Sequence, residues 1–204
     1  MTTVVAVRHG ETAWSRERRI QGWAPTPLTE SGRAQAGRIG ETLAAEYDVD
    51  RVVSSDLHRA TETTDEILEH VDAPLTTESA WRERDFGVFQ GLPADEWLAR
   101  FPEYELDGPD VPRKRPDSGE SLVDVRERVV DGWERLLANS EPTETIVVVA
   151  HGGPIRLILG HLKDLSIVEA ITEQSQTYCS INEFRHDHGT DGTTVVREND
   201  ADHR

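Results

Sequence analysis

Two histidines in this sequence each follow a short run of β-branched residues, and each is followed by glycine. His9 comes just after the apolar residues 4–7 and Arg8, and His151 comes directly after the similar run 145–150. Such runs predict buried β-strands. Ligands bind at the carboxyl ends of strands in open α/β sheets. If the two strands are parallel neighbours, both imidazoles lie at the same edge of the sheet.

Two arginines accompany these histidines. Arg8 precedes His9, and Arg59 lies in the first turn of a helix predicted after another short strand. An arginine can place two donors on one phosphate, and an imidazole can attack phosphorus. Two arginines and two histidines at one sheet edge therefore suit a dianionic phosphate. The alternative is that these side chains are simply solvated at the ends of their elements.

Other chemistries find less support in the sequence. There is no H-E-x-x-H pair and no pair of cysteines, which argues against a zinc site. The G-x-S-x-G turn of serine hydrolases does not occur. His186 and His188 lie in a polar turn near the end of the chain, so we expect solvent to surround them.

The charge balance narrows the range of partners. The chain has 204 residues with 39 acidic and 22 basic side chains, giving a formal net charge of -17. Nucleic acids and anionic membranes attract positive surfaces, so we expect neither as a partner. Cys179 is the single cysteine, and no signal peptide or bilayer-spanning apolar run is evident. We therefore expect a cytoplasmic protein.

Lysine is almost absent from the chain. Lys114 and Lys163 are the only two, and the other basic residues are arginines. Concentrated salt screens the self-repulsion of a strongly acidic surface. This composition suggests a halophilic protein.

The predicted strands and helices, which must position these side chains, indicate one α/β domain over residues 1–204, with a tail frayed from about 198. We expect strands at residues 4–7, 51–55, 75–77, 145–150, 178–184 and 193–196, and helices at 29–47, 57–71, 93–101, 122–137, 154–162 and 167–171. We expect loops at residues 14–27, 81–91 and 102–116. Asp56 is the expected N-cap of the helix that carries Arg59. The strand at 178–184 is expected near a sheet edge, where it could pair in a homodimer; a monomer is the alternative.

Six blocks of the sequence together resemble one protein family. They are V-R-H-G-E-T at 7–12, Q-G-W and P-L-T-E-S-G at 21–32, S-S-D-L-H-R-A-T-E-T at 54–63, R-E-R-D-F-G at 82–87, G-E-S at 119–121 and V-V-A-H-G-G-P-I-R at 148–156. Their identity and order are similar to those of the histidine phosphatase superfamily, which includes the cofactor-dependent phosphoglycerate mutases. The resemblance implies a phosphoglycerate mutase-like fold, a three-layer α/β/α sandwich with a mostly parallel central sheet.

The resemblance also implies roles for individual residues. His9 would form a phosphohistidine, while Arg8, Arg59 and His151 would hold the phosphoryl group. Glu83 would be the general acid and then the general base. The substrate-binding set would be Arg8, Ser15, Gln21, Gly22, Arg59, His151 and Gly152. For this chemistry we expect a neutral His9, a cationic His151, and a Glu83 kept protonated near neutral pH by burial against Trp81 and Phe86.

The expected function is metal-independent hydrolysis of small phosphorylated metabolites, without a cofactor. One alternative is a phosphoglycerate mutase, which would use 2,3-bisphosphoglycerate as its cofactor. Another is a regulator directed at phosphohistidine or phosphoproteins. The basic cluster Arg113-Lys114-Arg115 is either a solvated loop or a clamp for a second acidic group on the substrate.

Overall fold

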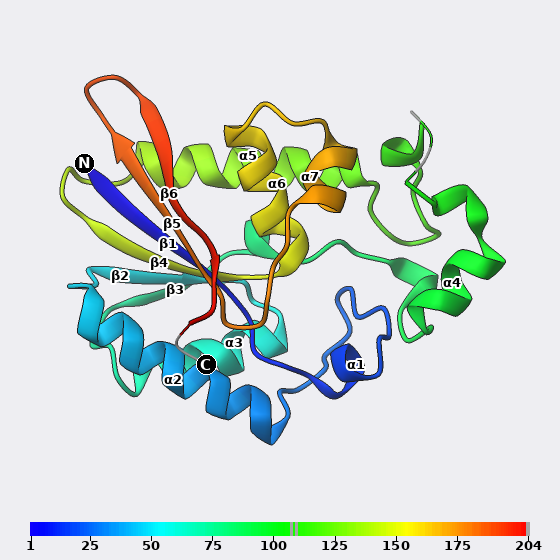
Figure 1. Cartoon of the computed structure of the whole chain (residues 1–204), viewed down its shortest axis with the longest axis horizontal. Helices are drawn as coiled ribbons and strands as arrows, with labels where there is room; N and C mark the ends of the chain where they lie inside the picture. The colour runs from blue at the N-terminus through cyan, green and yellow to red at the C-terminus, as the bar shows by residue number, and fades with distance from the viewer. Residues whose placement is uncertain (107, 109, 203–204) are drawn as a thin grey trace.

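A six-stranded sheet forms the centre of the molecule (Figure 1). The computed structural model describes residues 1–106, 108 and 110–202. The strands run in the order β3-β2-β4-β1-β5-β6. They are β1 Thr2–Arg8, β2 Arg51–Ser54, β3 Leu75–Thr77, β4 Thr145–Ala150, β5 Ile181–Asp187 and β6 Gly192–Asp200. Strands β1 to β4 pair in parallel, while β5 is antiparallel to its neighbours β1 and β6. The expected mostly parallel sheet is confirmed.

Helices cover both faces of this sheet. Below it in Figure 1 lie α2 (Glu30–Glu46) and α3 (His58–Leu68), and above it lie α5 (Leu122–Ala138), α6 (Gly152–Leu162) and α7 (Ile167–Glu173). Side chains alternate between the faces of a strand. Accordingly Val5 and Val7 of β1 pack with the α2 and α3 core, and Val4 and Ala6 pack with the α5 and α6 core. The expected three layers are confirmed.

Two short helices lie beyond the carboxyl end of β1, on the right of Figure 1: α1 (Ala13–Arg16) and α4 (Ala94–Arg100). We expected a loop from residue 14, and this was wrong at its start. Thr12 and Ser15 form a capping box, each side chain accepting a hydrogen bond from the other's backbone N–H, and this begins α1. The segments expected as loops at 81–91 and 102–116 contain three-residue 3-10 turns at Gly87–Phe89, Pro102–Tyr104 and Val111–Arg113.

An aromatic cluster holds α4 and its flanking turns together. Phe89 stacks near Trp97, Phe101 and Tyr104, with ring centroids 5.8, 4.6 and 5.2 Å away, and Phe86 meets Trp97 edge-on at 5.6 Å. Such ring pairs contribute stability beyond the area that they bury. This cluster forms one wall above the strand ends.

The carboxyl-terminal part of the chain corrects three expectations. The tail does not fray from 198, because β6 continues to Asp200 and Asn199 accepts a hydrogen bond from Thr177 N at 2.6 Å. Strand β5 lies between β1 and β6, so the segment at 178–184 is not a sheet edge. His186 is 4% exposed rather than solvated, because it lies on β5 and bonds Thr193 Oγ1 at 3.1 Å.

Two further observations complete the fold. Asp56 was expected to cap α3, but it pairs with Arg82 through two contacts of 2.6 and 2.5 Å, and Leu57 is the N-cap residue. Within the described part of the chain, no helix is both long and apolar enough to cross a membrane.

Candidate active site

The pairing of β1 with β4 brings the two strand-end histidines together. Arg8 stands opposite Ala150 in the parallel ladder, and the backbone N–H of His9 continues the ladder by donating to Ala150 O at 3.0 Å. The next residue on each strand is a histidine. The imidazole rings of His9 and His151 lie 5.0 Å apart between centroids, and both are buried.

Hydrogen bonding fixes which nitrogen of His9 is free to react. Its Nδ1 lies 2.8 Å from Gly10 O, and a carbonyl oxygen only accepts, so Nδ1 carries the proton. Nε2 is then the unprotonated nitrogen, and it accepts a hydrogen bond from Arg59 Nε at 3.2 Å. The ring therefore presents a lone pair beside a guanidinium.

The surroundings of His9 keep it neutral. Burial lowers its pKa well below 6.5, and the nearby charges of Arg59 and Arg8 lower it further. The expectation of a neutral His9 is confirmed, although burial is a larger cause than the positive surroundings. A neutral imidazole is the form that can attack an electrophile.

His151 differs from our expectation of a cation. Its Nε2 lies 2.9 Å from Ser55 Oγ, and its Nδ1 is buried with no hydrogen-bond partner. Burial lowers its pKa well below 6.5, with further lowering by Arg59, His9 and Arg8. These effects all favour the neutral imidazole, so His151 is neutral here. A bound phosphate dianion would add the missing negative charge.

Arg59 and Arg8 bring positive charge to the same place from different elements. Arg59, in the first turn of α3, is 1% exposed and donates to Gly22 O at 2.9 Å. Burial lowers its pKa to about 10, so it remains charged near neutral pH. Arg8 donates to Gln176 O at 2.6 Å and lies over the Tyr178 ring at 4.0 Å from its centroid.

Glu83 is held in position by two backbone donors. Its Oε1 accepts from Arg84 N at 2.9 Å, and its Oε2 accepts from Gly153 N at 3.1 Å. Gly153 lies in the first turn of α6, directly after His151 and Gly152. The candidate general acid is thus tied to the turn that follows the second histidine.

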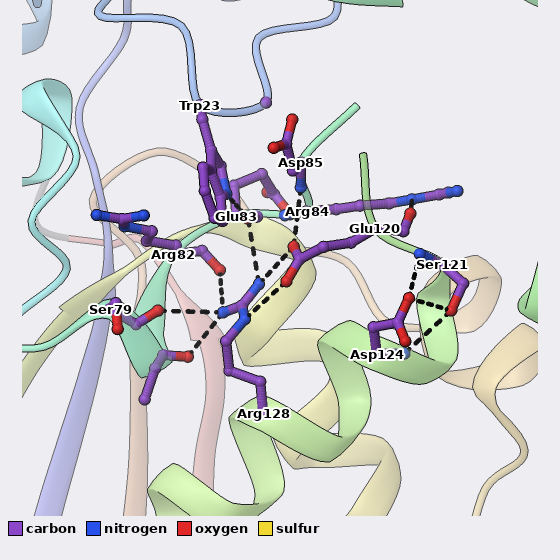
Figure 2. A network of polar contacts seen from close by, with 12 residues as sticks. Trp23, Ser79, Arg82, Glu83, Arg84, Asp85, Glu120, Ser121, Asp124 and Arg128 are labelled. Atoms are coloured by element: carbon purple, nitrogen blue, oxygen red, sulfur yellow. Dashed lines mark hydrogen bonds and ion pairs between the residues drawn. The ribbon is translucent and has the colours of Figure 1, made fainter. Parts of the chain in front are cut away.

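Arg128 of α5 fastens the segment that carries Glu83 (Figure 2). Its guanidinium donates to the backbone oxygens of Ala80, Arg82 and Glu83 at 2.9, 3.0 and 3.4 Å. It also forms a two-point ion pair with Glu120, with distances of 3.0 and 2.8 Å. From the other side, Trp23 Nε1 donates to Glu83 O at 2.7 Å. We name this set of contacts the Arg128 clasp.

These groups surround one cavity of about 540 Å³. Six of the residues expected in the site line it: Arg8, His9, Gln21, Gly22, Arg59 and Glu83. His151 and Gly152 are buried behind this lining, with Gly152 packed near the Arg8 guanidinium. The structure therefore brings together the five residues expected to be catalytic.

Ser15 is the expected substrate-binding residue that the structure places elsewhere. Its hydroxyl donates to Thr12 O at 2.8 Å and accepts from Thr12 N at 2.9 Å, within the capping box of α1. It is not among the residues that line the cavity. Gln21 Oε1, by contrast, lies at the cavity wall, where it accepts from Thr12 Oγ1 and Thr26 Oγ1.

The basic cluster at 113–115 also lies outside the cavity lining. Lys114 Nζ donates to Glu103 O at 2.6 Å, and Arg115 pairs with Asp124 at 2.7 Å. Arg113 is exposed. These contacts favour a solvated loop over a substrate clamp.

Several residues around the cavity were not singled out from the sequence. Arg84, Trp97 and Arg156 line it, and Arg128 supports it. Arg84 and Arg156 stand inside the motif blocks at 82–87 and 148–156, which is a signal that could have found them. Trp97 and Arg128 lie in helices, where their positions in the sequence give no sign of a role in the site.

Comparisons with known proteins agree with this geometry. A family model described as the histidine phosphatase superfamily (branch 1) matches residues 4–201. A 2,3-bisphosphoglycerate-dependent phosphoglycerate mutase 2 of Gloeobacter violaceus is 36% identical over 206 residues, covering 95% of this chain and 89% of the mutase.

Two solved structures share this fold, and the second of them is named as a phosphatase. YhfR of Bacillus stearothermophilus is 29% identical with a TM-score of 0.89, covering 100% of this chain and 99% of that one. A mycobacterial glucosyl-3-phosphoglycerate phosphatase in complex with VO3 is 29% identical with a TM-score of 0.84, covering 98% and 99% of the two chains.

Proposed function

Because the chain belongs to the histidine phosphatase superfamily, we propose that it hydrolyses phosphomonoesters of small metabolites through a phosphohistidine on His9. One observation carries this proposal: His9 Nε2 is unprotonated and accepts a hydrogen bond from Arg59, and His9 lines a cavity that also contains the carboxyl group of Glu83. A nucleophile, a phosphate-binding group and a proton donor are the three parts that such a reaction needs.

In the first step, His9 Nε2 attacks phosphorus and the bond from phosphorus to the ester oxygen breaks. The electron pair of that bond goes to the leaving oxygen, which takes a proton from Glu83. The proton stays on Nδ1 and continues to donate its hydrogen bond to Gly10 O, which stabilises the positive charge that phosphorylation adds to the imidazole. The alcohol then leaves.

In the second step, the Glu83 carboxylate removes a proton from water as the water oxygen attacks phosphorus. The bond from phosphorus to Nε2 breaks, and its electron pair returns to the imidazole. Inorganic phosphate leaves, and Glu83 has regained its proton. Arg8, Arg59 and His151 would bind the phosphoryl oxygens in both steps, so no metal or organic cofactor is required by this scheme.

A phosphoglycerate mutase is the second candidate, because several similar curated proteins carry that name. Incubation with 3-phosphoglycerate and a trace of 2,3-bisphosphoglycerate separates the two. A phosphatase releases inorganic phosphate, whereas a mutase forms 2-phosphoglycerate with little phosphate release. A regulator directed at phosphoproteins would instead bind a phosphopeptide and turn over neither small substrate.

The test of the phosphohistidine is His9→Ala, assayed with an aryl phosphate and by mass spectrometry after acid-free quenching. We expect loss of turnover and of the phosphorylated species, and no effect of a chelator on the wild type. The matched control is His70→Ala, which changes an exposed histidine in the turn after α3. Turnover retained by His9→Ala, or abolished by the chelator, would overturn the mechanism.

A further inference from the structure

The cavity is much larger than a phosphoryl group needs. Pockets of 300–1,000 Å³ bury ligands of drug size, and this one measures about 540 Å³. Beyond His9 and the two phosphate-facing arginines, its walls are mostly apolar and come from α4, α5, α6, α7 and the loops beside them. Trp97, Leu98, Leu157 and Ile171 are among these side chains. Covering an apolar part of a ligand with an apolar wall makes the free energy of binding more favourable.

Arg156 interrupts this apolar wall. It is half-buried on α6, lines the cavity, and follows Ile155 in the segment after His151. Its Nε is buried without a hydrogen-bond partner. Across the described residues, no carboxylate lies within ion-pair distance of its guanidinium, although the chain has 39 acidic side chains.

The lack of an ion pair does not by itself set Arg156 apart, because the exposed Arg16 and Arg38 also have none among the described residues. Its distinguishing feature is a buried Nε without a partner at the cavity wall, since other arginines near the site are engaged. Arg82, Arg115 and Arg128 are each paired with a carboxylate. Arg84, which also lines the cavity, is occupied in another way, donating to Glu120 O at 2.8 Å and Lys114 O at 3.2 Å. Arg8 and Arg59 are unpaired because the phosphoryl group is their proposed partner. Arg156 has no such assignment.

The positive charge of the cavity is consistent with a ligand that carries a second anionic group besides the phosphate. Arg156 lies close enough to Arg8 for its charge to lower the pKa of Arg8. Among the described residues, the acidic side chains that line the cavity are Glu83 and Glu105, and Glu105 is exposed. Four arginines line the cavity, so a phosphate dianion on Arg8 and Arg59 offsets only two of the four guanidinium charges, and Arg156 is left without an anionic partner among the described residues.

We propose that Arg156 binds a carboxylate on the alcohol part of the substrate, and that the body joining this carboxylate to the phosphate is apolar. This inference rests on the proposed phosphatase activity and adds the class of substrate: phosphomonoesters of hydroxy acids with an apolar body. Arginine suits this task because its fork matches the two oxygens of a carboxylate.

Three substrates with alcohols of similar leaving ability test the proposal: propyl phosphate, 3-phenylpropyl phosphate and 3-(4-carboxyphenyl)propyl phosphate. In the wild type we expect kcat/KM to rise about tenfold or more with the ring and again with the carboxylate, since each added contact is worth roughly a factor of ten. Arg156→Gln should remove the second gain and keep the first. Leu98→Ser should reduce the first gain.

The control is Arg38→Gln on the exposed side of α2, which should leave both gains unchanged. Equal loss on all three substrates in Arg156→Gln, or no carboxylate preference in the wild type, would overturn the subsite. Failure of the proposed function looks different, because the wild type would then hydrolyse none of the three. Circular dichroism and the thermal midpoint of Arg156→Gln show whether the variant is folded.

Discussion

The backbone N–H of Gly153 donates a hydrogen bond to Oε2 of Glu83 at 3.1 Å. This contact joins two segments that are far apart in the sequence, the loop after β3 and the first turn of α6. It places the candidate general acid against the same turn that begins with His151. The position of Glu83 therefore depends on a residue that has no side chain of its own.

Gly153→Ala should displace Glu83. A Cβ on Gly153 would collide with Oε1 of Glu83, and something must shift. We expect kcat to fall by about 10- to 100-fold with the fold retained, because a displaced proton donor loses part of the roughly 10²- to 10⁴-fold that general acid catalysis contributes. Steady-state kinetics with an alkyl phosphate measure this. The control is Gly37→Ala on α2, where a Cβ meets nothing within 4 Å; it should keep wild-type kinetics and gain up to about 1 kcal/mol of stability. Wild-type kcat in Gly153→Ala would show that Glu83 tolerates the shift or has no part in the reaction.

The Arg128 clasp should act on catalysis through Glu83. Arg128→Gln removes the ion pair with Glu120 and loosens the backbone at Glu83. A poorly placed acid slows expulsion of an alkoxide more than expulsion of a stable phenolate. We therefore expect a kcat loss of about tenfold or more on alkyl phosphates and a much smaller one on 4-nitrophenyl phosphate. Glu120→Gln should show the same pattern.

The control for the clasp is Arg115→Gln, which breaks the exposed pair with Asp124. It should leave both classes of substrate unaffected. If Arg128→Gln slows both classes by the same factor, the clasp serves stability rather than the placement of the acid.

The buried histidines should make stability fall in mildly acidic solution. The pKa of His9 and of His151 is well below 6.5 in the folded protein. Below pH 6.5 the unfolded chain therefore binds protons that the folded chain does not, and the free energy of unfolding decreases as pH falls. Each histidine contributes about 1.4 kcal/mol per pH unit in this window.

Denaturant unfolding at pH 7.5, 6.5 and 5.5 measures this slope. His151→Gln should reduce the dependence below pH 6.5 by about one such contribution. His70→Ala, at an exposed site, should not change it. A slope that is the same in His151→Gln and the wild type would mean that His151 is protonated in the fold.

The acidic surface predicts a dependence on salt. With a formal net charge of -17, repulsion among surface carboxylates should weaken the fold in dilute buffer. The Debye length is about 30 Å at 0.01 M salt and about 3 Å at 1 M. We expect the thermal midpoint to rise steadily with KCl up to about 1 M, where screening is nearly complete. Sucrose at matched osmolality is the control, and equal midpoints in dilute buffer and molar KCl would contradict the halophilic interpretation.

The sequence predicted those parts of the site that depend on local patterns. Runs of β-branched residues ending at His9 and His151 identified the two strands, and their parallel pairing was a condition that the sheet satisfies. The position of Arg59 at the start of a helix could also be predicted, because the helix follows a short strand.

Contacts between distant segments could not be predicted in this way. Arg128 occupies a polar position on α5, where an arginine is ordinary, and only the packing of the Glu83 loop against that helix shows its purpose. The prediction that His151 is a cation was wrong for a related reason. Its burial and the distance to the two arginines are properties of the folded chain, and they outweigh what its chemistry alone suggested.

The parallel ladder between β1 and β4 has a consequence for how this molecule loses activity. The separation of His9 and His151 is set by backbone hydrogen bonds in the centre of the sheet, not by loops that could loosen independently. A slip of one residue between these strands would turn one imidazole away from the other. The geometry of the reactive centre thus depends directly on the packed central sheet. Its inactivation by heat or denaturant should therefore coincide with unfolding of the central strands.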